Sequence, residues 1–233
     1  MQSTKYIDKR FLLIAVIKLL GVLISITLLI DFLSIDSLLA DFIYRQEGNQ
    51  WQLKNAWVTA VFIHKAGKYF SIMLLTSVLI LMLAAYRYSF LAQWKYRLQF
   101  LFIATALATL FISIGKALTN ISCPWDFARY GGLVEYLPLL KQLWIRNGSQ
   151  CFPAGHASAG FAWVSLYFMG RSSKAPWRWW GLGFAVLMGS LFGISQQLRG
   201  AHFLSHDLWS FGICWMVSLI CYGVLLKPYE STN

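Results

Sequence analysis

Long apolar stretches separated by short polar segments dominate the pattern of this chain. A helix that crosses a bilayer needs about 20 mostly apolar residues. Six stretches reach or approach that length: 11–30, 69–86, 98–118, 154–169, 179–198 and 203–226. The fourth is short and the sixth carries Asp207. The pattern therefore predicts an all-α, polytopic membrane protein with six transmembrane helices, folded as one domain over residues 1–233.

The segment between the first two spans, residues 33–67, mixes polar and apolar positions. This mixture is typical of an amphipathic helix that lies along a membrane surface. The first span follows Lys5, Lys9 and Arg10 and resembles a signal peptide, but no small-residue cleavage site follows it. We expect it to be retained as a helix.

The composition excludes several classes of protein. Of the 233 residues, 58% are hydrophobic and 12% are charged, and mean hydropathy is +0.57. Soluble globular domains carry about 25% charged residues. The net charge of +11 would suggest a nucleic-acid partner in a soluble protein. In a membrane protein it indicates topology and contact with anionic lipids, so membrane lipids are expected partners and nucleic acid is not.

The loops differ in charge, which predicts an orientation. Three groups of cations lie in alternate loops, at 5–10, 87–97 and 171–178, with Lys227 after the last span. The other loops mix cations with acidic residues. Because short basic loops stay in the cytoplasm, we expect both termini there and the other loops in the periplasm of a bacterial inner membrane.

Ionisable side chains gather at the outer ends of the last four spans. Such groups are costly at membrane depth and mark a functional site by default. The ionisable side chains at these ends are Lys116, Asp126, Arg129, His156, Arg199, His202, His206 and Asp207. His156 follows Pro153, Ala154 and Gly155 at a predicted helix start, where free N–H groups favour an anion. Two histidines on facing helices can divide nucleophilic attack and proton donation, so the set indicates phosphoryl transfer.

The order of these residues resembles the type 2 phosphatidic acid phosphatase (PAP2) superfamily. That family carries Lys-x6-Arg-Pro, Pro-Ser-Gly-His and Ser-Arg-x5-His-x3-Asp on a six-helix core. Here Lys116 precedes Cys123-Pro124 by the same spacing, and the later pieces are Pro153 to His156 and Gly200 to His202. The motif region covers 116–207. The strings Cys-Pro-Trp-Asp, Phe-Pro-Ala-Gly-His and Arg-Gly-Ala-His-Phe-Leu-Ser-His resemble a bacterial branch of the superfamily more closely than its founding pattern.

The resemblance implies a role for each matching residue. His202 would attack phosphorus and form a phosphohistidine, and His156 would protonate the leaving group. Lys116 would hold phosphate oxygens, helped by the backbone amides of Ala154 and Gly155. The implied substrate is a lipid phosphate or diphosphate whose head group lies at the outer face of the membrane, cleaved without a metal or other cofactor.

Four positions depart from the family pattern: Cys123, Ala154 and His206 replace Arg, Ser and Asp, and Gln196 replaces the second Arg. Arg199 and Arg129 are candidates to supply the lost charges. On a continuous helix His206 would face His202 while Asp207 is rotated away. Two arrangements stay open: Asp207 holds His206, which orients His202, or Asp207 reaches His202 directly.

Cys123 and Cys151 flank the outer loop between the third and fourth spans. In an oxidising periplasm these two cysteines can pair, which would stabilise the loop by roughly 3 to 4 kcal/mol in the chain-entropy model. We hypothesise such a bridge. His64, in the first outer segment, has no partner that the sequence identifies.

Three other functions compete with the lipid phosphatase. A lipid phosphotransferase would pass the phosphoryl group to a lipid instead of water. A non-catalytic lipid-binding or scaffold member would keep the anion pocket without the chemistry. A thiol oxidoreductase could use Cys123 and Cys151, but no Cys-x-x-Cys is present. Phosphatidic acid, phosphatidylglycerol phosphate, an isoprenyl diphosphate and lipid A phosphates are all candidate substrates.

Overall fold

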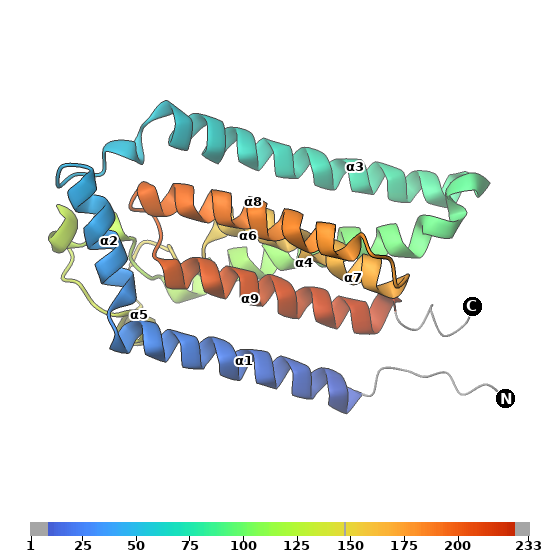
Figure 1. Cartoon of the computed structure of the whole chain (residues 1–233), viewed down its shortest axis with the longest axis horizontal. Helices are drawn as coiled ribbons and strands as arrows, with labels where there is room; N and C mark the ends of the chain where they lie inside the picture. Colours follow the sequence, from blue (N-terminus) through green and yellow to red (C-terminus); the bar gives the residue numbers. More distant parts are fainter. Residues whose placement is uncertain (1–8, 147, 227–233) are drawn as a thin grey trace.

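The computed structural model describes residues 9–146 and 148–226, which form a bundle of roughly parallel and antiparallel helices (Figure 1). In chain order the α-helices are α1 (Lys9–Phe32), α2 (Ile35–Gln46), α3 (Gly67–Arg87), α4 (Lys95–Thr119), α5 (Leu139–Ile145), α6 (Gly155–Phe161), α7 (Ser165–Ser172), α8 (Arg178–Leu198) and α9 (Leu204–Cys221). Shorter 3₁₀ and π segments join them: η1 (Gln52–Lys54), η2 (Trp57–Ala66), η3 (Ser89–Trp94), η4 (Pro124–Asp126), η5 (Ala128–Tyr130), η6 (Ala162–Val164) and η7 (Tyr222–Leu226). The described part contains no β-strand, so the prediction of an all-α fold is confirmed.

Within the described residues, five helical stretches are long and apolar enough to cross a membrane: Lys9–Phe32, Gln52–Arg87, Ser89–Asp126, Arg178–Leu198 and Leu204–Leu226. The chain is therefore a helical, polytopic membrane protein, as its hydropathy predicts. The fourth predicted span corresponds to α6, η6 and α7, which follow one another without a loop but contain only 7, 3 and 8 residues. The expected count of six spans is not confirmed.

The core of the bundle explains why this fourth segment is short and less apolar. Ala157, Ala162, Val164 and Ser165 have no exposed surface, because α6 and α7 are enclosed by α4, α8 and α9. A helix that is surrounded by protein does not need a lipid-facing side. The Thr105 and Ser165 hydroxyls, 2.8 Å apart, hydrogen-bond across this interface.

Small residues allow α6 and α8 to approach closely. A Cβ added to Gly160 would lie 2.2 Å from the backbone nitrogen of Gly189, and one added to Gly189 would lie 2.1 Å from the Phe161 ring. Such small-residue contacts are typical of helix packing in membranes. They hold the last turn of α6 against the middle of α8.

The segment that precedes α3 covers one end of the bundle. α2 runs across this end, transverse to the long helices (Figure 1), with Asp36, Ser37 and Ala40 buried. This agrees with the predicted surface helix. The rest of the segment was not anticipated: η1 follows a turn, and η2 joins α3 directly, so that the second apolar stretch begins at Gln52.

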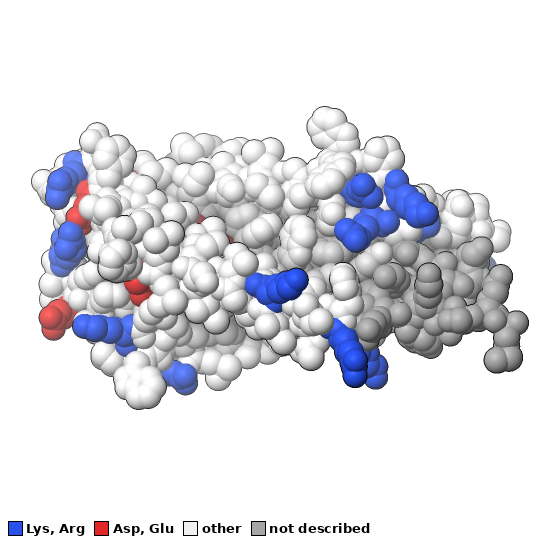
Figure 2. Space-filling model, turned by 60° about the horizontal axis from the view of Figure 1, so that its bottom comes forward, with Lys and Arg blue, Asp and Glu red and all other residues white. Residues whose placement is uncertain are grey.

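The two ends of the bundle differ in charge. The first described residue of α1 and the last of η7 lie at one end, together with the α3–α4 and α7–α8 connections (Figure 1). Basic residues gather at that end, while the opposite end shows both signs of charge (Figure 2). The first turns of α6 and α9 and the last turn of α8 lie at the opposite, mixed end.

Candidate active site

Lys116 lies against the first turn of α6. A Cβ added to Gly155 would be 3.4 Å from the Nζ of Lys116, so the ammonium group rests on the glycine. One residue earlier, Gly115 makes room for the ring of Pro153. The glycines thus bring the cation of α4 beside the N-terminal end of the helix that carries His156, where N–H groups lack carbonyl partners from a preceding turn.

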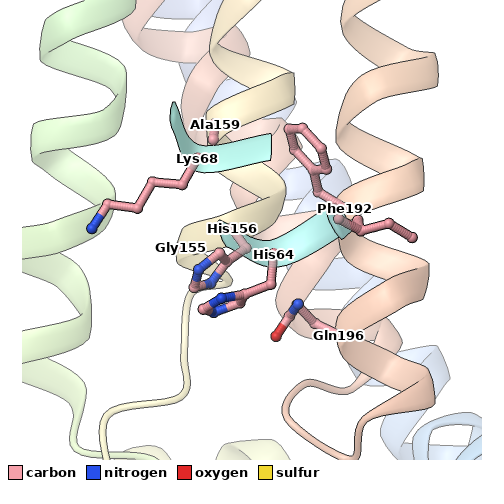
Figure 3. A pocket seen from close by; sticks show the side chains of 8 residues that line it. His64, Lys68, Gly155, His156, Ala159, Phe192 and Gln196 are labelled. Atoms are coloured by element: carbon pink, nitrogen blue, oxygen red, sulfur yellow. The ribbon is translucent and has the colours of Figure 1, made fainter. Parts of the chain in front are cut away.

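His156 stacks on His64. The two ring centroids are 3.8 Å apart and the planes are inclined by 28° (Figure 3). His64 comes from η2, in the part of the chain whose role the sequence did not reveal. No local signal links the two positions, which are brought together only by the packing of η2 on α8 and of α3 on α6.

A pocket of about 200 Å³ opens beside these rings. It is lined by Ile63, His64, Lys68, Gly155, His156, Ala159, Phe192 and Gln196. Gln196 extends from α8 toward His64 (Figure 3). The polar groups of the lining can carry positive charge or donate hydrogen bonds, and it contains no acidic residue. An anion fits this pocket better than a cation.

Arg199 approaches the pocket from behind Gln196. Its Nη1 donates a hydrogen bond to Oε1 of Gln196 at 3.0 Å, and its Nε donates to the carbonyl of Lys54 at 2.8 Å. The guanidinium is therefore fixed between η1 and the end of α8. Arg199 does not itself line the pocket. It orients the side-chain amide of Gln196, which does.

His202 lies in the turn between α8 and α9 and is 4% exposed. Burial lowers the pKa of His202 well below its ordinary value, and the nearby His206, Lys116 and His156 act in the same direction. A backbone hydrogen bond with Cys151 acts in the opposite direction. The imidazole is thus neutral at pH 7, the state in which a ring nitrogen can attack.

His206 faces His202, although not for the reason expected. α9 begins at Leu204, so His202 precedes the helix, yet the two rings meet edge to face with centroids 5.7 Å apart. His206 is fully buried between Phe152 and Phe203, at 5.3 and 5.5 Å. No hydrogen bond of good geometry reaches either ring nitrogen of His206 within the described residues, although the Cys151 backbone lies close to the ring.

The Asp207 carboxylate hydrogen-bonds to neither His202 nor His206 among the described residues, which corrects both arrangements that the sequence left open. Its Oδ2 accepts a hydrogen bond of 2.6 Å from Nε2 of Gln197, and its Oδ1 has no partner within residues 9–146 and 148–226. The carboxylate also packs against Gly193. One position along a helix is a rotation of about 100°, and this turns Asp207 toward α8.

Asp36 of α2 takes a position that the sequence did not predict. Its two carboxylate oxygens accept hydrogen bonds from the backbone N–H of Ser205, at 3.0 Å, and from the Ser205 hydroxyl. It thereby caps the first turn of α9, next to His206. Burial raises the pKa of Asp36 to about 6, although the hydrogen bonds from Ser205 lower it.

The motif segments are also fastened to one another. The N–H of Ala154 donates to the carbonyl of His206 at 3.3 Å, and the Ser210 hydroxyl donates to the carbonyl of Ala154 at 3.0 Å. The expectation that the Ala154 amide holds phosphate is therefore wrong, because this N–H already has a partner. Gly155 remains at the start of α6, beside Lys116.

Arg129, a candidate phosphate ligand, is paired elsewhere. Its Nε donates to Oδ1 of Asp41 at 2.7 Å, and its Nη2 bonds Oδ2 of the same carboxylate. The guanidinium lowers the pKa of Asp41. This bidentate ion pair joins α2 to the outer loop at the surface, and Arg129 does not line the histidine pocket.

Cys123 and Cys151 are joined by a disulfide with Cα atoms 5.2 Å apart, within the usual range for such bonds. The bridge ties the end of the Lys116 segment to the start of the His156 segment. The Asp126 carboxylate lies within 4.8 Å of both sulfurs, a grouping that could bind a metal if the sulfurs were thiolates. The disulfide removes these two ligands.

Similarity to a known protein family adds to the evidence on this site. The family model described as the PAP2 superfamily matches residues 97–229, more than half of the chain. No match was found among the curated proteins or among the solved structures. The matched range contains Lys116, His156 and His202, and it leaves out His64 and Asp36. With this match and the helical fold, the chain belongs to the PAP2 superfamily.

Proposed function

We propose that this protein is a membrane phosphatase that hydrolyses a phosphate monoester or diphosphate of a lipid. The observation that carries the proposal is the contact of the Lys116 ammonium with Gly155, beside His156 and at the same end of the bundle as the buried, neutral His202. An anion bound there meets a fixed cation, a nucleophile and a proton donor. These are the groups that phosphoryl transfer from an ester requires.

The reaction proceeds in two steps. A ring nitrogen of neutral His202 attacks phosphorus, and the bond from phosphorus to the lipid oxygen breaks. His156, which burial favours in its neutral form, takes up the proton of the bound phosphate monoanion and passes it to that oxygen. In the second step His156, again neutral, takes a proton from water, and the resulting hydroxide displaces His202 from phosphorus. Phosphate and a lipid alcohol, or a lipid monophosphate, are the products. Lys116 balances the charge of the phosphoryl oxygens throughout.

The site lies at the end of the bundle opposite the basic connections. By the positive-inside rule, that basic end is cytoplasmic. We therefore place the reaction at the periplasmic face of a bacterial inner membrane, with both termini in the cytoplasm. The Cys123–Cys151 disulfide agrees with an oxidising compartment.

The test is phosphate release by the purified protein in micelles from phosphatidic acid, phosphatidylglycerol phosphate, an isoprenyl diphosphate and lipid A. We expect His202→Ala and His156→Ala each to abolish release, while Arg146→Ala, at an exposed position outside the pocket, leaves it unchanged. Full activity in either histidine variant would contradict the nucleophile and acid roles of these side chains.

A chromogenic aryl phosphate separates the two histidines. Its leaving group departs without a proton, so His156→Ala should still give a burst of one phenolate per protein as phosphohistidine accumulates. His202→Ala should give no burst. Equal behaviour of the two variants would refute the division of labour between nucleophile and acid.

A non-catalytic, lipid-binding role is the second candidate. It is favoured by the third motif, because His206 stands where the family pattern has Asp, and the carboxylate of the neighbouring Asp207 is bound to Gln197. A chain that binds lipid phosphates but releases no phosphate from any of the four substrates would have this role. A phosphotransferase would be recognised by release that requires an added lipid alcohol and yields a new phospholipid.

A further inference from the structure

An apolar groove of about 290 Å³ runs between α8 and the junction of η2 with α3. It is lined by Phe62, Ile63, Ala66, Gly67, Phe70, Met188, Leu191 and Phe192. Phe62 and Leu191 are 59% and 45% exposed on apolar stretches that span the membrane. The groove therefore opens to the hydrocarbon of the bilayer rather than to water.

This groove adjoins the histidine pocket. Ile63 and Phe192 line both. The ring of Phe192 packs on Gly67, where an added Cβ would lie 2.6 Å from its edge. In Figure 3 the two imidazoles and Gln196 lie close together, and the Phe192 ring lies apart from them. One end of the combined cavity is thus cationic and polar, and the other end is apolar.

A second groove on α8 provides a comparison. It also has a volume of about 290 Å³ and includes Val186, Ser190 and Ile194. These side chains lie on the face of α8 opposite to Met188 and Phe192, since residues of a helix advance by about 100°. This second groove shares no lining residue with the histidine pocket. Apolar grooves of this size thus occur on both faces of α8, but only the first shares lining residues with the pocket that contains His156.

We propose that the groove between α8 and the η2–α3 junction binds a hydrocarbon chain of the lipid phosphate whose head group occupies the histidine pocket. The ligand is an anionic amphiphile, because the polar end offers the histidines, Lys68 and the nearby Lys116, and the apolar end offers aromatic and aliphatic side chains. The substrate enters sideways from the bilayer, with its head group leading toward His156. The inference rests on the proposed function and adds the site of the chain.

The first experiment fills the groove with Ala66→Phe. We expect the ratio of kcat/KM for dioleoyl phosphatidic acid to kcat/KM for p-nitrophenyl phosphate to fall at least tenfold, chiefly through KM of the lipid. Val186→Phe, in the second groove, should leave this ratio at the wild-type value. An unchanged ratio in Ala66→Phe, or an equal fall in Val186→Phe, would overturn the proposal. If the wild-type protein releases no phosphate from either substrate, the proposed function fails instead.

A second experiment needs neither turnover nor a folded variant. Wild-type protein in phosphatidylcholine micelles is irradiated with phosphatidic acid that carries a diazirine in its acyl chain, and the labelled peptides are identified. We expect labels on the peptide containing Met188 to Phe192, displaced by excess unlabelled phosphatidic acid and not by further phosphatidylcholine. Equal displacement by both lipids would mean that bulk lipid fills the groove, and would overturn the proposal.

Discussion

Stacking of His64 on His156 fixes the plane of the candidate acid at the mouth of the pocket. Aromatic pairs of this kind contribute about 0.5–1.5 kcal/mol beyond their buried area. If that energy holds His156 in its reactive orientation, its loss corresponds to a decrease in rate of up to roughly tenfold.

We therefore predict that His64→Ala lowers kcat for lipid phosphate severalfold, to about tenfold, with little change in KM. His64→Phe should restore most of kcat, because a phenyl ring keeps the stacking surface. Steady-state phosphate release measures both, with Lys65→Ala, an exposed neighbour outside the pocket lining, as the control. If His64→Phe were as impaired as His64→Ala, stacking would not be the function of this ring.

The raised pKa of Asp36 predicts how the stability of the folded protein varies with pH. Its pKa is about 6 in the folded protein and 3.8 is its ordinary value, so the folded state retains a proton that the unfolded chain releases. The group thus contributes most to stability below about pH 4, and this contribution is lost as pH rises through about 6. A shift of this size corresponds to about 3 kcal/mol.

Asp36→Asn removes the charge and keeps both a donor and an acceptor toward Ser205. We expect the variant to unfold at a higher Tm than wild type at pH 7.5 and at a similar Tm at pH 4.5, measured by thermal denaturation in micelles. Asp41→Asn is the matched control on the same helix. Since the pKa of Asp41 is lowered, its loss should reduce Tm at pH 7.5. A pH profile of Asp36→Asn identical to wild type would contradict this assignment.

The sequence identified His156, His202 and Lys116 as candidates because the spacing of these residues resembles the family pattern. It did not locate Asp36 or His64. Asp36 bonds a residue 169 positions away, and neither its helix nor its neighbours contain a signal for that partner. Asp207 was misplaced for a related reason: only the packing of α9 against Gly193 and Gln197 decides which way its carboxylate turns.

Among the elements, the contact between α6 and α8 tolerates the least change. At Gly160 any side chain would collide with the backbone of Gly189. We predict that Gly160→Leu destabilises the protein by at least about 1–3 kcal/mol, the usual cost of overpacking. Thermal unfolding followed by size-exclusion chromatography in detergent measures it.

Gly183→Leu is the matched control for this prediction. It lies on α8, and a Cβ added there meets nothing within 4 Å. We expect its melting temperature to stay close to wild type. Comparable loss in both variants would mean that leucine perturbs α8 itself, and that the small residues are not needed for packing.

Hydropathy predicted the long helices well, because lipid-facing helices must be apolar along their whole length. Hydropathy was least informative for helices that are surrounded by other helices instead of lipid. α6 and α7 are enclosed, so small and polar residues suffice there and the apolar run is short. In 33–67 only α2 follows the surface pattern, whereas η2 continues into the second long helix.

At the scale of the whole molecule, the distribution of charge predicts the orientation in the membrane. Leu133, 98% exposed, lies in the outer loop, and Ser173 lies in the α7–α8 connection at the basic end. The native cysteines are disulfide-bonded or buried, so introduced cysteines can be labelled selectively.

We predict that a membrane-impermeant maleimide labels Leu133→Cys in intact spheroplasts and labels Ser173→Cys only after lysis. The reason is that cations near the ends of spans keep their loops in the cytoplasm. The labelled protein is detected by its increased apparent mass on a gel. Labelling in the reverse order would place the histidine pocket on the cytoplasmic side.

The outer cover of His202 comes from the part of the chain before residue 97. Trp51 lies over Gly200, the carbonyl of Lys54 holds Arg199, and Asp36 caps the helix that follows His202. The candidate histidines His156 and His202 and the cover over them are consequently encoded in different stretches of the gene. Evolution can rewrite the leading stretch, which supplies the cover and one wall of the apolar groove, while these histidines of the trailing stretch stay untouched.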